Sequence, residues 1–90
     1  MMKRLIVVDD DAEMCSMLED FLTQEGYRVR NFTNPLEVIK NLKDEAADLV
    51  ITDLNMPEMS GLEVTRAVKD INSEIPVLLI TAFGTLESAI

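Results

Sequence analysis

Three short apolar runs of four residues each do most to constrain the fold of this 90-residue chain. They lie at residues 5–8, 49–52 and 77–80, and all three are rich in β-branched side chains. None shows the alternation of a strand with one solvent-facing side, so each predicts a strand buried on both faces. Segments with helical periodicity lie between them. This order predicts an α/β fold with a parallel sheet and helices on both faces.

The first helix is predicted over residues 11–24, with acidic residues at its start and Gly26 after its end. Asp11 is assigned as the helix cap rather than as a metal ligand. Apolar residues at helical spacing define the expected inner face, namely Met14, Met17, Leu18, Phe21 and Leu22. Cys15 on the same helix is expected to be an inert residue, buried or half-buried.

The next two elements follow from alternation and from a cap. Polar and apolar residues alternate over residues 27–31, which predicts a more exposed strand at a sheet edge. Asn34 then provides a cap, and Pro35 stands at the first helical position. A second helix is therefore predicted from Pro35 to about residue 44.

The third helix is predicted from a capping box made by Ser60 and Glu63. Its expected inner face consists of Val64, Ala67, Val68 and Ile71. Residues 84–90 look like the start of a fourth helix that is cut short. The order of strands and helices is thus βαβαβαβα, which predicts one doubly wound domain over residues 1–90, without a linker or an internal repeat.

Polar residues stand at the carboxyl ends of the buried strands, where ligands of such sheets bind. They are Asp9, Asp10, Asp53 and Thr81. If the first and third strands are neighbours, Asp10 and Asp53 face one pocket. Two carboxylates ~5 Å apart at an effective dielectric of ~20 repel by ~3 kcal/mol, so the pocket should take up a proton or a divalent cation. All candidate ligands are oxygens, which favours Mg²⁺ over zinc.

Magnesium keeps several waters and leaves room for a phosphate oxygen, so a carboxylate nucleophile that attacks phosphorus is plausible here. Asp53 stands in the middle of the predicted cluster. Thr81 is placed to donate a hydroxyl hydrogen bond to a phosphoryl oxygen, and the small Ala82 beside it keeps the pocket open.

Composition excludes several other classes of function. The chain has 17 acidic and 8 basic residues and a net charge of −9, so direct nucleic-acid binding is not expected. The absence of histidine excludes a histidine-based metal site or general base. A single cysteine forbids an internal disulfide and fits a cytoplasmic location. No apolar run approaches the ~20 residues of a membrane span, so no membrane association is expected.

Taken together, the chain resembles the receiver domain of bacterial two-component response regulators. The matching residues are Val7-Val8-Asp9-Asp10, Asp53 with Met56-Pro57 and Gly61, and Thr81-Ala82. The resemblance implies the flavodoxin-like receiver fold with strand order 2-1-3-4-5. The segment Thr81-Ala82-Phe83-Gly84 is further similar to receivers of sigma-54-dependent activators, which suggests control of transcription.

The resemblance also implies roles for individual residues. Asp53 would be the phosphoacceptor, and Thr81 would be the switch hydroxyl. Asp10 would hold Mg²⁺ directly and Asp9 mostly through water. The backbone carbonyl of Asn55 would complete the protein's share of the coordination. A sensor histidine kinase would supply the phosphoryl group, and an output domain or downstream protein would read the change near the fourth helix. The domain would be a regulatory phosphoacceptor that catalyses only its own phosphorylation, not an enzyme.

The chain departs from the receiver pattern at its C-terminal end. Receivers have a fifth strand that ends in a lysine paired with the phosphoryl group, and a fifth helix. Neither is expected in these 90 residues, so the receiver is predicted to be C-terminally incomplete. Two alternatives therefore stay open. One is an interaction or regulatory fragment that keeps the fold without phosphotransfer. The other is a magnesium-dependent phosphohydrolase with an aspartyl nucleophile, disfavoured because the second acid such enzymes carry is Asn55 here.

The missing fifth strand also predicts an exposed sheet edge. In the receiver order, the strand at residues 77–80 would have an unpaired outer row of N–H and C=O groups. Unpaired apolar edges recruit other chains. Self-association through this strand, by dimerisation, exchange or aggregation, is therefore expected.

Overall fold

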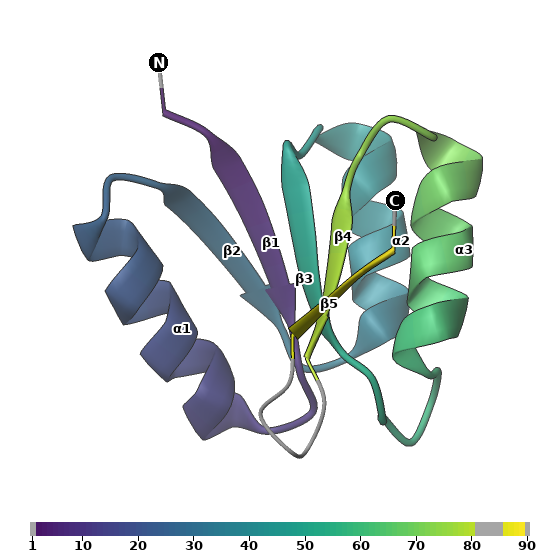
Figure 1. Ribbon diagram of the computed structural model, residues 1–90, viewed down its shortest axis with the longest axis horizontal. Helices are drawn as coiled ribbons and strands as arrows, with labels where there is room; N and C mark the ends of the chain where they lie inside the picture. The colour runs from purple at the N-terminus through teal and green to yellow at the C-terminus, as the bar shows by residue number, and fades with distance from the viewer. Residues whose placement is uncertain (1, 81–85, 90) are drawn as a thin grey trace.

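The computed structural model describes residues 2–80 and 86–89 and contains one five-stranded sheet of order β2-β1-β3-β4-β5 (Figure 1). The strands β1 to β4 are mutually parallel, and β5 is antiparallel to β4. Their bounds are Arg4–Val8 for β1, Arg28–Phe32 for β2, Leu49–Asp53 for β3, Val77–Ile80 for β4 and Leu86–Ala89 for β5. The predicted parallel strands and the edge position of β2 are therefore confirmed.

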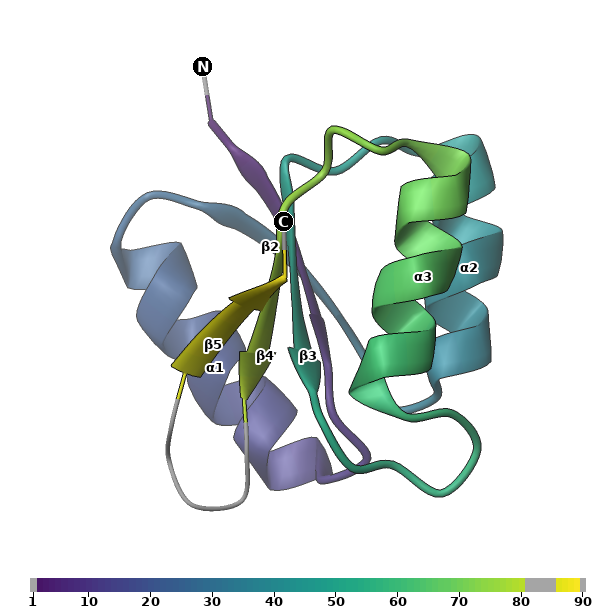
Figure 2. The same cartoon turned by 45° about the vertical axis from the view of Figure 1, so that its right-hand side comes forward.

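In the described part of the chain, three helices cover the two faces of this sheet. The helix α1 (Ala12–Gln24) lies on one face, and α2 (Pro35–Asp44) and α3 (Gly61–Ile71) lie side by side on the other (Figures 1 and 2). This arrangement confirms the predicted doubly wound architecture. Within residues 2–80 and 86–89, no helix has the length and apolar character needed to cross a membrane.

Each helix begins at the cap that the sequence predicted. The Asp11 carboxylate accepts hydrogen bonds from the backbone N–H groups of Glu13 and Met14, at 2.9 and 3.3 Å. Asn34 caps α2, and Ser60 forms both hydrogen bonds of the capping box that opens α3. Such caps satisfy N–H groups that a helix leaves unpaired at its start. They therefore fix where each chain segment leaves the edge of the sheet that carries the carboxyl ends of the parallel strands.

The main core lies between the sheet and the pair α2 and α3. Its fully buried side chains include Ile6, Val50, Val77, Val38 and Val64, which come from three strands and both helices. A second, smaller cluster lies under α1, where Val7, Cys15 and Ile51 are buried. Cys15 is thus buried, as expected.

The predicted inner face of α1 is wrong in two of its members. Leu18 and Leu22 pack against the smaller cluster, but Met17 and Phe21 are 57% and 59% exposed. The helix packs mainly on β2 and β1. Met17 and Phe21 therefore stay exposed, and no second helix of the described residues lies beside α1 on this face of the sheet. Periodicity gave the direction of the apolar face but overestimated its buried width.

The helix predicted at residues 84–90 is also wrong over the residues that the structure describes there, because Leu86–Ala89 forms β5. This strand pairs with β4 in antiparallel register, with Ile80 opposite Leu86 and Val77 opposite Ala89. The outer edge of β4 is therefore paired rather than exposed. The expected reason for self-association through β4 thus does not apply to this structure, and the outermost strand on this side is β5.

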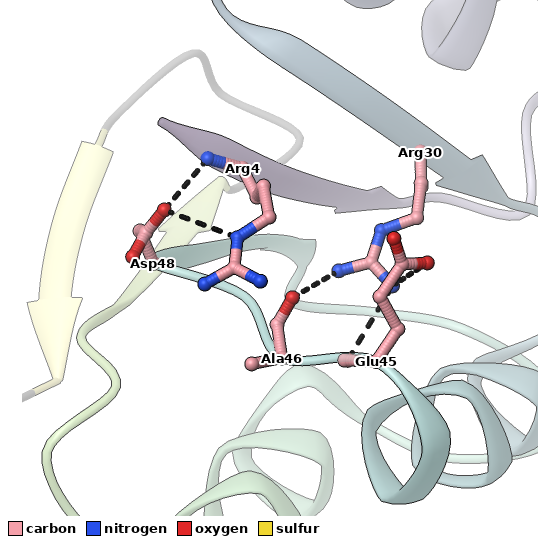
Figure 3. Close-up of polar contacts among 5 residues, drawn as sticks. All are labelled: Arg4, Arg30, Glu45, Ala46 and Asp48. Carbon is pink, nitrogen blue, oxygen red and sulfur yellow. Dashed lines mark hydrogen bonds and ion pairs between the residues drawn. The ribbon is translucent and has the colours of Figure 1, made fainter. Parts of the chain in front are cut away.

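Two arginines join β1 and β2 to the connection between α2 and β3 (Figure 3). Arg4 N–H donates to Asp48 Oδ2 at 2.7 Å, and its Nε lies 3.7 Å from the same oxygen. The Arg30 guanidinium bonds Glu45 Oε2 at 3.1 Å and the Ala46 carbonyl at 2.8 Å. It also bonds the Asn41 side chain. Through these bonds, Arg30 links β2 to the end of α2 and to the connection that leads into β3.

Replacing Arg30 should therefore destabilise the fold. Arg30→Gln is expected to lower the free energy of unfolding by about 2 kcal/mol, because a half-buried charged donor with several partners is lost. Arg28→Gln, at an exposed position of the same strand, is the matched control and should change little. Urea unfolding followed by circular dichroism measures both. Equal losses for the two variants would contradict the anchoring role of Arg30.

Candidate metal-binding site

The register between β1 and β3 brings three carboxylates together. Val8 lies opposite Thr52 in this parallel pair, so the residues that follow β1 emerge beside the last residue of β3. Asp9, Asp10 and Asp53 each offer one carboxylate oxygen, and these oxygens all lie within 4.8 Å of one another. The structure thus assembles the acidic cluster that the sequence predicted from neighbouring strand ends.

The three carboxylates differ in their surroundings. Asp9 is only 8% exposed, and its Oδ1 accepts a hydrogen bond from the Asp11 backbone N–H at 2.9 Å. Asp10 is exposed, and Asp53 is half-buried. The Oδ1 atom of Asp53 accepts a longer hydrogen bond, 3.4 Å, from the Asn55 N–H. One carboxylate is therefore held firmly in the protein, while the other two are open to solvent and to a ligand.

Burial and mutual repulsion raise the affinity of this cluster for positive charge. Burial raises the pKa of Asp9 to about 6, against an opposing hydrogen bond from the Asp11 N–H, and the negative charges of Asp53 and Asp10 raise it further. Burial also raises the pKa of Asp53; the Asn55 N–H opposes the increase, and Asp10 adds to it. The carboxylates of Asp9 and Asp53 are thus costly to keep charged without a cation nearby.

The donor set fits a hard divalent cation. The donors are carboxylate oxygens, which suit Mg²⁺, and the sequence offers no histidine to favour zinc. The nearby Cys15 thiol is directed elsewhere, because its Sγ donates to the Asp9 carbonyl at 3.3 Å. Burial also raises the pKa of this thiol, which disfavours the thiolate that a metal would bind.

The segment after Asp53 turns sharply back toward α3. Asn55 is exposed at this turn, and Met56 is buried in the main core. Gly61 N–H donates to the Leu54 carbonyl at 2.8 Å. A Cβ atom at Gly61 would lie 2.5 Å from the Asp53 carbonyl oxygen, closer than real Cβ contacts allow. In the sequence, Gly61 stood out only as one of the residues that resemble receiver domains; its contact with Asp53 depends on a tertiary approach that spacing alone does not reveal.

The other predicted site residues have different outcomes. Asn55 lies beside Asp53 through the Asx hydrogen bond described above, which keeps its backbone close to the cluster. Thr81, the predicted switch hydroxyl, lies outside the described residues. Asp11, predicted as a cap, serves as the cap of α1 and is not a member of the three-carboxylate cluster.

Comparisons with known proteins identify relatives over nearly the whole chain. The response regulator receiver domain family matches residues 5–90. The transcriptional regulatory protein ZraR of Klebsiella oxytoca is 37% identical over 96% of this chain, which spans 19% of that regulator. The response regulator protein TrrA from Thermotoga maritima, solved in complex with Mg²⁺-BeF, is 37% identical with a TM-score of 0.84. That match covers 90% of this chain and 70% of TrrA.

A second solved structure contains a kinase. It holds the histidine kinase ThkA in complex with the response regulator protein TrrA, and the similar chain is 36% identical to this one. The TM-score is 0.85, with 93% of this chain and 72% of that chain covered. The chain described here therefore spans about a fifth of the first curated relative and about 70% of these solved chains.

The raised pKa of Asp9 predicts how stability depends on pH without divalent cations. The folded state keeps a proton on Asp9 up to about pH 6, whereas the unfolded chain releases it near 3.8. The contribution of this group to stability is therefore full below about pH 4 and is lost as the pH rises through about 6. Asp9→Asn should remove this dependence and raise the free energy of unfolding at pH 7 by on the order of 1–2 kcal/mol.

Urea unfolding at several pH values in the presence of a chelator measures this effect. Asp11→Asn is the matched control, because asparagine is also a good helix cap and the position is exposed. A pH dependence that is unchanged in Asp9→Asn would show that another group carries it.

Proposed function

Because the chain belongs to the response regulator receiver domain family, we propose that it accepts a phosphoryl group on Asp53 from a phosphohistidine of a sensor histidine kinase. The observation that carries this proposal is the cluster of Asp9, Asp10 and Asp53 oxygens within 4.8 Å at one edge of the sheet. A bound Mg²⁺ would neutralise negative charge on the transferring group and relieve the repulsion among these carboxylates.

The proposed reaction uses the ionised carboxylate of Asp53 as the nucleophile. One carboxylate oxygen forms a bond to phosphorus while the P–N bond to the histidine breaks, and an acyl phosphate results on Asp53. The half-buried position of Asp53 leaves this oxygen open to a donor. Asp53 is also the last residue of β3, so the strand gives the nucleophile a rigid support.

The remaining residues are proposed to hold the cation and the phosphoryl group. Asp10 is exposed and would bind the ion directly, whereas the buried Asp9, which is already hydrogen-bonded, would act mostly through water. The backbone carbonyl of Asn55 would complete the protein ligands. Thr81 would donate its hydroxyl hydrogen bond to a phosphoryl oxygen and couple phosphorylation to a change of surface.

The relatives support the proposed partners. TrrA has been solved with a histidine kinase, which supports a kinase as the donor for this chain. ZraR is a transcriptional regulatory protein, which supports an output in transcription control. We therefore propose a cytoplasmic regulatory phosphoacceptor of the sigma-54-dependent activator type, not an enzyme that turns over a separate substrate. With a net charge of −9, this segment would leave nucleic-acid binding to another part of the assembly.

One observation favours the alternative function, an interaction or regulatory fragment that keeps the receiver fold without phosphotransfer. Receivers use a lysine beside the phosphoryl group, and Lys69 instead donates to the Ser73 carbonyl just beyond the end of α3. The other lysines, Lys3, Lys40 and Lys43, belong to the N-terminal segment and to α2. An interaction fragment with the receiver fold would bind partners but gain no phosphoryl group.

Phosphorylation by a small donor separates these two functions. Incubation with acetyl phosphate and Mg²⁺ should add one phosphoryl group, detected as a single mass increase of the intact chain. Asp53→Asn keeps the shape of the side chain but removes the nucleophile, so it should abolish this increase. Asp70→Asn, at an exposed position of α3, is the control and should be labelled normally. Undiminished labelling of Asp53→Asn would overturn the assignment, and no labelling of the unaltered chain would favour the interaction fragment.

Metal binding can be tested independently of phosphorylation. Titration with Mg²⁺ should shift the NMR amide signals around Asp9, Asp10 and Asp53, with weak affinity because magnesium gives up its waters reluctantly. Asp10→Asn should weaken binding, since it removes one negative ligand, while Asp70→Asn should not. Shifts confined to other parts of the chain would show that the cluster is not the metal site.

A further inference from the structure

Thr52 is a fully buried polar side chain that the proposed reaction does not use. It stands next to Asp53 in β3, with Val8 and Leu79 as its register partners on the two neighbouring strands. Valine has nearly the same shape and avoids the cost of burying a hydroxyl. The Thr52 hydroxyl therefore calls for a specific partner, and its Oγ1 donates to the Asp53 carbonyl at 3.0 Å.

The same carbonyl also lies in close contact with Gly61. A Cβ atom at Gly61 would lie 2.5 Å from the Asp53 oxygen and 2.9 Å from the Cα of Leu54. The Gly61 N–H also donates to the next carbonyl along the chain, that of Leu54, at 2.8 Å. Two consecutive peptide groups after the candidate phosphoacceptor are therefore fixed by tertiary contacts.

These contacts determine the direction of the turn that follows β3. The Leu54 N–H donates to the Ile80 carbonyl at 2.9 Å, so the Asp53–Leu54 peptide is held on both of its polar sides. The Asn55 N–H then reaches Asp53 Oδ1 at 3.4 Å. The carboxylate of Asp53 and the backbone of Asn55 are thus oriented by one fixed peptide between them.

We propose that the Thr52 hydroxyl is a positioning group that, together with Gly61, presents the Asp53 carboxylate and the Asn55 carbonyl to the cation. This inference rests on the proposed function, in which the cluster binds Mg²⁺. Thr52 itself touches neither the cation nor the phosphoryl group; it acts through the Asp53 carbonyl. Groups that orient metal ligands in this way commonly change metal affinity by about 10-fold or more when they are removed.

Matched threonine variants separate the hydroxyl from its packing. Thr52→Val keeps the volume and removes the hydrogen bond, so it should weaken Mg²⁺ binding by about 10-fold. Thr52→Ser keeps the hydroxyl and should bind nearly as the unaltered chain does. Thr65→Val is the control, because it removes a similar hydroxyl bond, from Thr65 Oγ1 to the Gly61 carbonyl at 2.8 Å, without touching Asp53. NMR titration with Mg²⁺ measures all four proteins, and unfolding in urea confirms that each is folded.

The outcomes decide the proposal in either direction. Weakened binding in Thr52→Val alone supports it. Unchanged binding in Thr52→Val overturns it. Equal weakening in Thr52→Ser or Thr65→Val also overturns it, because packing rather than the Thr52 hydroxyl would then be responsible. If the unaltered chain binds no Mg²⁺, the proposed function fails, and amide exchange without the cation decides the positioning role. Faster exchange of the Asn55 and Gly61 N–H groups in Thr52→Val than in Thr52→Ser supports it, and equal exchange overturns it.

Discussion

The parallel pairing of β1 with β3 is the constraint on which the rest of the structure depends. It sets Val8 opposite Thr52, and so it forces the residues after both strands to the same place. The apolar side chains that drive this pairing are themselves fully buried, among them Ile6 and Val50. Burial of such side chains contributes ~1.5–3 kcal/mol each, which is enough to offset repulsion among a few carboxylates at the edge. The acidic cluster is thus held together by the core and not by its own interactions.

The fold moderates this repulsion without removing it. The cap residue of α1, Asp11, supplies one N–H to Asp9, and the turn after β3 supplies one to Asp53. These donors lower the pKa of each carboxyl, yet burial still keeps both values above the ordinary range. Carboxylates whose negative charge was fully compensated by hydrogen bonds from the protein would have little affinity for a cation. Here each of these two carboxylates accepts one backbone hydrogen bond, which compensates its charge only in part. The cluster therefore still attracts a cation.

Sequence patterns predicted the elements whose signals are local. Short apolar runs located β1, β3 and β4, and the capping residues located all three helix starts. The errors have a common physical cause, since each depends on what lies beside an element. Residues 86–89 carry good helix formers, but pairing with β4 outweighs that preference. Met17 and Phe21 fit the helical period, but no neighbour within the described part of the chain covers them.

The candidate site was predictable to the same extent and for the same reason. Asp9, Asp10 and Asp53 could be placed together because strand ends of a parallel sheet converge. The contact of Gly61 with the Asp53 carbonyl could not, because it requires the approach of α3 to the end of β3. The hydrogen bond from the Thr52 hydroxyl to this carbonyl could not either, because it depends on how a buried side chain is turned within β3. Neither residue type signals such a role in a sequence. Only the folded structure shows that the buried Thr52 hydroxyl and the glycine at position 61 both contact the Asp53 carbonyl.

The distribution of charge over the sheet explains why the cluster stays acidic although the chain contains arginines. Arg4 and Arg30 are engaged where β1 begins and where β2 meets the end of α2, with Asp48 and Glu45 as their partners. Those pairs join β1 and β2 to the connection that leads into the amino end of β3, whereas the three carboxylates lie at the carboxyl ends of β1 and β3. Among the described residues, the paired bases therefore stabilise one edge of the sheet, while the acids of the opposite edge stay without a basic partner. The fold thus separates its structural charges from the charges that are available for a cation and a phosphoryl group.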